Sequence, residues 1–194
     1  MRALLRYGLI LGLICLVATG LLAIVNRLTL PQITIQLNRE TEKSLKEVLP
    51  EAASFEPVRQ NNGIIYYRAL NGTGGVIGAA FKASGKGYSS VIETMVGMKK
   101  DGTINAIKVL AQNETPGLGS RITEIKDDTT IFDFIKGKKQ DTAEKPWFGE
   151  QFSGKDIRGL SGIQAITGAT ISSQAVIDSV KEKTQEIKRL LNGN

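Results

Sequence analysis

Twenty consecutive residues without a charge, Tyr7 to Asn26, constrain this 194-residue chain more than any other feature. At about 1.5 Å of rise per residue, a helix of that length matches the roughly 30 Å hydrocarbon core of a bilayer. The segment therefore predicts one transmembrane helix over residues 7–26. A cleaved signal peptide is the competing interpretation. Apolar residues continue through Val25, however, beyond the length of about 7–15 residues that is usual for a signal core.

The charges on either side of this segment predict its orientation. Arg2 and Arg6 precede it and Arg27 follows it, with no acidic residue among the first 27. Basic residues accumulate on the cytoplasmic side of membrane helices. We therefore expect the helix to lie in the cell (inner) membrane, with residues 1–6 as a cytoplasmic tail. The main domain is then periplasmic or extracellular.

Composition excludes several kinds of chemistry. The chain has no histidine and one cysteine, Cys15, so it can form neither an intramolecular disulfide nor a Cys-His dyad, and histidine-ligated haem and Cys-rich metal sites are also excluded. Beyond residue 27, 22 basic residues are interleaved with 19 acidic ones, which does not favour nucleic-acid binding. The one basic cluster, Lys136 to Lys139, is expected to be a solvated loop.

The remaining sequence predicts an α+β fold, an antiparallel sheet with flanking helices preceded by the transmembrane helix. Residues 27–56 are expected to hold a juxtamembrane helix and linker, and residues 57–194 the main domain. Hydrophobic periodicity and turn residues define the elements within them. These are an amphipathic helix over 31–49, a hairpin of 63–70 with 76–81, a second hairpin of 91–98 with 103–111, a glycine-rich loop region over 113–165 and a helix over 173–192.

Hydroxyl residues gather just before the last predicted helix, in the run Thr167-Gly168-Ala169-Thr170-Ile171-Ser172-Ser173. Backbone N–H groups at a helix amino terminus favour phosphate. The structural alternative is a capping loop in which Ser172 or Ser173 is the N-cap and Gly168 makes the turn. The residues alone leave both interpretations open.

Two other loops are candidates for a ligand site. In Glu114-Thr115-Pro116-Gly117-Leu118-Gly119, the glycines would let a flat ring lie against the backbone and Leu118 offers an apolar contact. The stretch from Gly85 to Ser90 lacks the spacing of a nucleotide phosphate loop and favours a simple connector, although Tyr88 is a candidate for lining a pocket.

Taken in order, these motifs resemble the FMN-binding domain family. The run Thr167-Gly168-Ala169-Thr170-Ile171-Ser172 is similar to the family motif S/T-G-A-T-x-S/T, and residues 114–119 resemble its E-T-P-G-L-G signature. The family also tends to have similar residues at the positions of Gly87-Tyr88 and Pro146-Trp147-Phe148. One difference is Gln164, where the family often has aspartate. Length and anchor are most similar to the family of G subunits of Rnf electron transport complexes, which is related to the C subunits of sodium-pumping NADH:quinone oxidoreductases.

The resemblance implies a covalent flavoprotein. FMN would be joined through its phosphate to Thr170, which is an acceptor and not a catalytic residue, by a flavin transferase that uses FAD and Mg²⁺. The resemblance implies no catalytic residue and no resident metal. The candidate cofactor-binding residues are Thr115, Gly117, Leu118, Gly119, Thr167, Gly168, Ala169 and Ser173.

The function implied is that of an electron-carrying subunit, not a complete enzyme alone, within an ion-translocating complex between ferredoxin and NAD. Its partners would be the other membrane subunits. Two alternatives remain open: a tethered anion-binding module without redox chemistry, and a free-standing extracellular flavoprotein reductase. Because residues 7–26 carry no charge, ion translocation would belong to the partner subunits.

Overall fold

The computed structural model describes residues 2–60, 63–124 and 146–192. The chain divides into two units, residues 1–43 and 44–194, which are treated separately below. The basic cluster at Lys136 to Lys139 and the middle of the predicted loop region lie outside the described residues.

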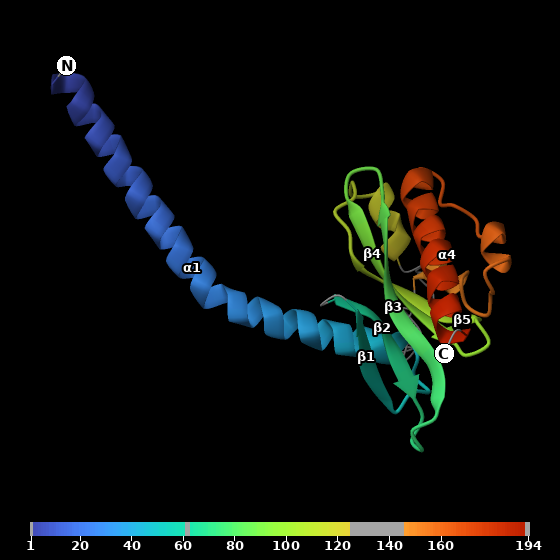
Figure 1. Ribbon diagram of the computed structural model, residues 1–194. Coiled ribbons are helices and arrows are strands. Elements are labelled where there is room, and N and C mark those ends of the chain that lie inside the picture. The colour runs from blue at the N-terminus through green and yellow to red at the C-terminus, as the bar shows by residue number, and fades with distance from the viewer. Residues whose placement is uncertain (1, 61–62, 125–145, 193–194) are drawn as a thin grey trace, which may run out of the picture. The chain divides into compact units, whose positions relative to one another are not determined.

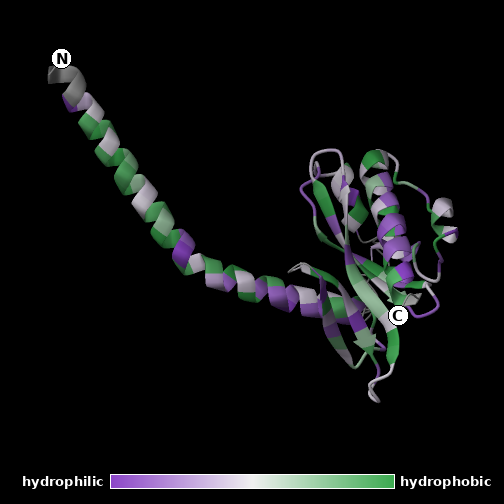
Figure 2. Ribbon diagram, in the orientation of Figure 1, coloured by the Kyte–Doolittle hydropathy of each residue, from purple (hydrophilic) through white to green (hydrophobic). Residues whose placement is uncertain are grey.

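The first unit consists of the helix α1 (Arg2–Val48) up to Lys43. The sequence separates a transmembrane helix from an amphipathic one, whereas the structure has one helix that continues through Pro31. Figure 2 shows that hydrophobic residues dominate the amino-terminal half of α1 and that hydrophilic residues are frequent in the rest. Among the described residues, α1 is the one helix long and apolar enough to cross a membrane.

The second unit is built on a five-stranded antiparallel sheet in which every strand pairs with its neighbour in the chain. Both predicted hairpins are confirmed, and Gly102 has the positive φ of +90° that the Asp-Gly turn requires. The first strand is not predicted by the sequence, because charged residues and Pro57 interrupt its pattern. The strands are β1 (Ser54–Gln60), β2 (Gly63–Leu70), β3 (Val76–Lys86), β4 (Val91–Lys99) and β5 (Ile104–Ala111).

The helix α4 (Thr170–Asn192) lies along one face of the sheet and packs on β3 and β4 (Figure 1). The helix α4 approaches β3 closely at Gly85, where a β-carbon would collide with the carbonyl oxygen of Ala175. Three short helical turns complete this layer, and the core between them includes Phe81, Phe148 and Val180. The turns are η1 (Gly119–Thr123), α3 (Trp147–Glu150) and η2 (Gly159–Gly162).

The other face of the sheet is covered by the end of α1. Leu45, Val48 and Leu49 are at most 3% exposed and pack against Met95 and Ala106. The amide nitrogen Nδ2 of Asn105 donates to the Val48 carbonyl at 2.8 Å. The last turn of α1 therefore belongs to the core of the second unit.

Candidate functional site

The helix α4 begins three residues earlier than predicted, at Thr170. The Ser173 N–H donates to the Ala169 carbonyl at 2.8 Å, so Ala169 is the N-cap. Gly168 makes the turn before it with a φ of +83°, as expected. Alanine has no side-chain acceptor, so the first backbone N–H groups of α4, starting at Thr170, gain no side-chain cap from Ala169.

The alternative interpretation, in which Ser172 or Ser173 caps the helix, is wrong, because both hydroxyls lie inside the first turn and bond elsewhere. The Ser173 hydroxyl oxygen is fully buried and accepts the Ile166 N–H at 3.0 Å. The Ser172 hydroxyl donates to the Oε2 atom of Glu114 at 2.6 Å. Ser173 thus supports the loop before α4, and Ser172 joins α4 to the segment that contains Glu114.

Glu114 joins three segments that are far apart in the sequence. Besides the bond from Ser172, its carboxylate accepts the N–H groups of Tyr88, Ser89 and Ser90 at 3.1, 3.0 and 2.8 Å. The Ser90 hydroxyl adds a fifth bond at 3.0 Å. The loop after β3, the loop after β5 and the start of α4 are therefore held by one side chain.

Glu114 is ionised at neutral pH. Burial raises the pKa of its carboxyl, but the hydrogen bonds from Ser172, Ser90 and Ser89 outweigh burial and lower the pKa from 4.5 to about 2. Each of these donors favours the charged form. The residue is only 6% exposed, so Glu114 carries a buried carboxylate that is compensated by hydrogen bonds.

Two glycines leave room for this carboxylate. A β-carbon at Gly87 would lie 2.7 Å from Oε1 of Glu114, and one at Gly119 would lie 2.6 Å from Oε2. Both distances are too short for a side chain, so the two loops close around Glu114 only because glycine occupies these positions.

These three segments surround an open cavity of about 320 Å³. Around it, Tyr88, Leu118 and Ile171 are 74%, 51% and 56% exposed, so apolar side chains face solvent beside Thr170, which is itself exposed. Isolated exposed apolar residues are common, but a group around a cavity is typical of a ligand site. The lining residues are Tyr88, Glu114, Thr115, Leu118, Gly119, Gly168, Ala169, Thr170, Ile171 and Ser172.

The structure thus brings most of the predicted site residues together. Thr115, Leu118 and Gly119, which lie in the loop after β5, meet residues 168–170 at the cavity. Gly117 and Thr167, like Ser173, are not among the lining residues.

Gly117 has a positive φ of +73° and shapes the loop. The Thr167 carbonyl accepts a hydrogen bond from the Nη1 atom of Arg121 at 3.0 Å. Both residues therefore lie in the framework of the cavity.

Sequence reasoning missed Glu114, Ser172 and Ile171 as residues of the cavity. Glu114 is the first residue of the E-T-P-G-L-G motif. A carboxylate at that position is the one sequence signal that could have indicated its role. Its partners lie 24 to 58 residues away in the chain, so no local pattern indicates them.

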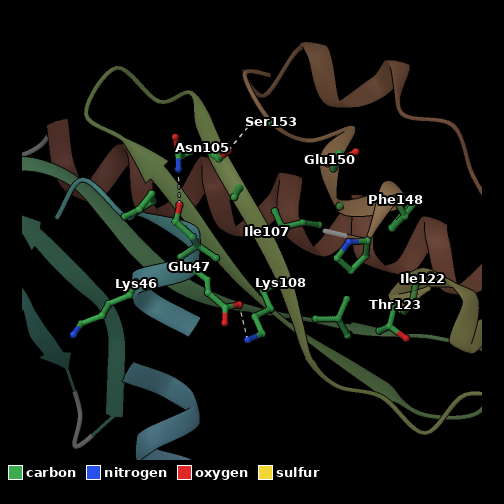
Figure 3. Close-up of a pocket in the computed structure, with 16 residues that line it drawn as sticks. Lys46, Glu47, Asn105, Ile107, Lys108, Ile122, Thr123, Phe148, Glu150 and Ser153 are labelled. Atoms are coloured by element: carbon green, nitrogen blue, oxygen red, sulfur yellow. Dashed lines mark hydrogen bonds and ion pairs between the residues drawn. The ribbon is translucent and has the colours of Figure 1, made fainter. Parts of the chain in front are cut away.

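A separate cavity of about 640 Å³ lies along β5, between the last turn of α1 and α3 (Figure 3). Ile107, Ile122 and Phe148 give it apolar walls, and the ion pair of Glu47 with Lys108 lies at its side, with Nζ 2.6 Å from Oε2. It contains no residue of the two motifs. We therefore place the candidate site at the cavity beside Thr170.

Comparison with known proteins identifies the family of the chain. The FMN-binding domain family matches residues 87–185, which include the whole cavity, and the RnfG N-terminal region matches residues 1–48. The G subunit of the ion-translocating oxidoreductase complex of Methanosarcina acetivorans is 31% identical, over 84% of each chain.

Two further relatives cover more of the chain. The G subunit of the ion-translocating oxidoreductase complex of Shewanella piezotolerans is 30% identical, over 94% of this chain and 89% of its own. The G subunit of the Na(+)-translocating ferredoxin:NAD(+) oxidoreductase complex of Acetobacterium woodii is 32% identical, over 95% and 92%. The chain therefore belongs to the FMN-binding domain family and, within it, to the G subunits of ion-translocating oxidoreductase complexes.

Proposed function

We propose that this chain carries FMN joined through its phosphate to the hydroxyl of Thr170, and that it transfers electrons as a subunit of an ion-translocating oxidoreductase complex. The observation that carries the proposal is the position of Thr170. It is exposed, it is the first residue of a long helix, and it lines the cavity of the FMN-binding domain.

The start of α4 fits a phosphate. The first three N–H groups of the helix have no partner within it, and Ala169 provides no side-chain cap. A phosphate ester on Thr170 would lie next to these donors and at the positive end of the helix dipole. The absence of a capping side chain, which costs a helix about 0.5–2 kcal/mol, is then compensated by the cofactor.

The walls of the cavity fit a flat aromatic ring. Leu118 and Ile171 lie exposed on two of the segments that surround it, and Tyr88 adds an aromatic side chain from the third. A bound ring would remove this apolar surface from water, which is favourable at about 25 cal/mol per Å². When bound, the flavin supplies the redox chemistry, and the protein residues hold and orient it.

The covalent bond requires a second protein. In the proposed reaction, a flavin transferase places FAD at the exposed Thr170 hydroxyl, the threonine oxygen forms a bond to the phosphorus of the FMN moiety, the phosphoanhydride bond breaks and AMP leaves. The hydroxyl proton is released. The chain has no histidine, so an imidazole base for this proton would have to come from the transferase.

The proposed partners are the other membrane subunits of the complex. The relative from Acetobacterium woodii is named as part of a Na(+)-translocating ferredoxin:NAD(+) oxidoreductase complex. By similarity, we propose that this chain carries electrons within such a complex, with residues 1–6 in the cytoplasm and the flavin domain on the periplasmic or extracellular side. The arginines that flank residues 7–26 support this orientation.

In-gel fluorescence tests the covalent assignment. The chain is co-expressed with an active flavin transferase, denatured and examined for a fluorescent band, alongside Thr170→Ala and the matched control Thr73→Ala, an exposed threonine in the turn between β2 and β3. We expect fluorescence in the wild type and in T73A, and none in T170A. A dark wild-type band with a transferase shown to be active would refute the proposal and favour an anion-binding module without flavin.

A further inference from the structure

Among the residues that the structure describes, Glu114 is the one charged side chain that lines the cavity beside Thr170. Its two oxygens accept five hydrogen bonds, and the donors belong to the loop after β3 and to α4. None of the sequence motifs assigns it a part in binding. The structure, however, places it in the loop that offers Leu118 and bonds it to the first turn of α4, where Thr170 lies.

A carboxylate is the group that this arrangement requires. Three backbone N–H groups and two hydroxyls point at Glu114. A glutamine would present its NH₂ group to some of these donors, so N–H groups would face each other with no acceptor between them. An ionised oxygen also accepts stronger hydrogen bonds than a neutral one. The shape of the cavity therefore depends on the charge of Glu114.

The link to Thr170 runs through Ser172. The 2.6 Å bond from the Ser172 hydroxyl to Oε2 of Glu114 fixes the first turn of α4, in which Thr170 is two residues earlier. Both ends of this bond are buried, because Ser172 is 1% and Glu114 6% exposed. A turn held in this way fixes the backbone position from which the Thr170 hydroxyl extends, before any cofactor is attached.

The charge of Glu114 also acts on whatever occupies the cavity. Reduction of a flavin adds negative charge to its ring, and a carboxylate on the wall of the same cavity opposes that addition. The opposition is strongest at sites that are shielded from water.

We propose that Glu114 is a positioning residue of the flavin site: through Ser172 it orients Thr170 for flavin attachment, and its negative charge lowers the midpoint potential of the attached flavin. The inference rests on the proposed function, since it concerns a flavin on Thr170. It assigns to Glu114 an electrostatic effect that a purely structural residue would not have.

The test compares Glu114→Gln with Glu114→Asp and with the control Glu182→Gln. Glu182 is an exposed carboxylate on α4, about 18 Å along the helix from Thr170 at 1.5 Å per residue. The full chain is co-expressed with the transferase in each case. The rate of flavin attachment is measured by gel fluorescence under limiting transferase, and the midpoint potential is measured by spectroelectrochemistry.

For E114Q we expect attachment to slow on the order of tenfold to a hundredfold and the midpoint potential to shift upward. E114D keeps the charge, so its potential should stay close to that of the wild type even if attachment slows. E182Q should leave both quantities unchanged. A wild-type potential in E114Q, with the flavin attached, would overturn the inference.

A second variant keeps the proposal testable if E114Q does not fold. Ser172→Ala removes the bond to α4 but keeps the carboxylate, so it should slow attachment without raising the potential. Wild-type attachment in S172A would contradict the positioning role. A wild-type chain that takes up no flavin at all would instead contradict the proposed function, so the two failures are distinguishable.

Discussion

Acid should destabilise the domain through Glu114, and the size of the effect follows from its pKa. The carboxyl has a pKa of about 2 in the folded chain against 4.5 ordinarily, so the unfolded chain binds the proton more tightly. A folded-state pKa that is lowered contributes stability above pH 4.5, and this contribution is lost as the pH falls toward 2. At 1.36 kcal/mol per pKa unit it amounts to about 3 kcal/mol at pH 7 and about 1.4 kcal/mol at pH 3.

The assay is urea unfolding of the full chain in detergent between pH 7 and pH 2.5, followed by the fluorescence of Trp147, the single tryptophan. Other carboxylates also titrate in this range, so the quantity of interest is the difference in unfolding free energy between the wild type and Glu114→Gln. We expect this difference to shrink by more than half from pH 7 to pH 3. Glu182→Gln, which replaces an exposed carboxylate on α4, is the control and should change the unfolding free energy by no more than about 0.5 kcal/mol. If the difference in unfolding free energy between the wild type and E114Q stays constant from pH 7 to pH 2.5, the reasoning is refuted.

Three further predictions concern the fold and the cavity. A soluble fragment of residues 44–194 should unfold cooperatively by circular dichroism, whereas one of residues 50–194 keeps all five strands but lacks the buried Leu45, Val48 and Leu49 and should not; equal cooperativity would contradict the place of the end of α1 in the core. Gly168→Ala forces a β-carbon into a φ of +83°, so it should lower the unfolding free energy by about 1–2 kcal/mol and reduce in-gel flavin fluorescence; a variant equal to the wild type would show that the turn tolerates a side chain. Leu118→Ala removes an exposed side chain, so stability should change by no more than about 0.5 kcal/mol while the fluorescence anisotropy of the attached flavin falls; unchanged anisotropy would mean that Leu118 does not contact the ring.

The sequence predicts those parts of the fold that local patterns determine. The Asp101-Gly102 turn indicates its hairpin because glycine adopts the positive φ that the turn requires. The periodicity of the last helix likewise predicts its extent to within three residues. The strand β1 escapes prediction because Pro57 and its charged neighbours resemble a loop, and it forms because β2 is available to pair with it.

The candidate site divides in the same way. The two motifs indicate which loops line the cavity, because their glycines and hydroxyls are suited to phosphate and to a flat ring. The role of Glu114 depends on contacts with Tyr88 and Ser172, which are 26 and 58 residues away in the chain. The pairing of β4 with β5, in which Glu93 lies opposite Ala111, brings the loop after β3 beside Glu114, and the packing of α4 on β3 adds Ser172. The same applies to Ser173, whose hydroxyl is directed into the core and not toward the cavity.

The identity of the modified residue is the most direct test of a flavin on Thr170. After co-expression with an active transferase, tryptic digestion of the wild type should release the peptide of residues 159–181, and its fragmentation should place a mass gain of FMN less one water on Thr170. The same peptide from Thr170→Ala should be unmodified. An added mass that maps to Thr167, Ser172 or Ser173, or an unmodified wild-type peptide, would contradict the assignment.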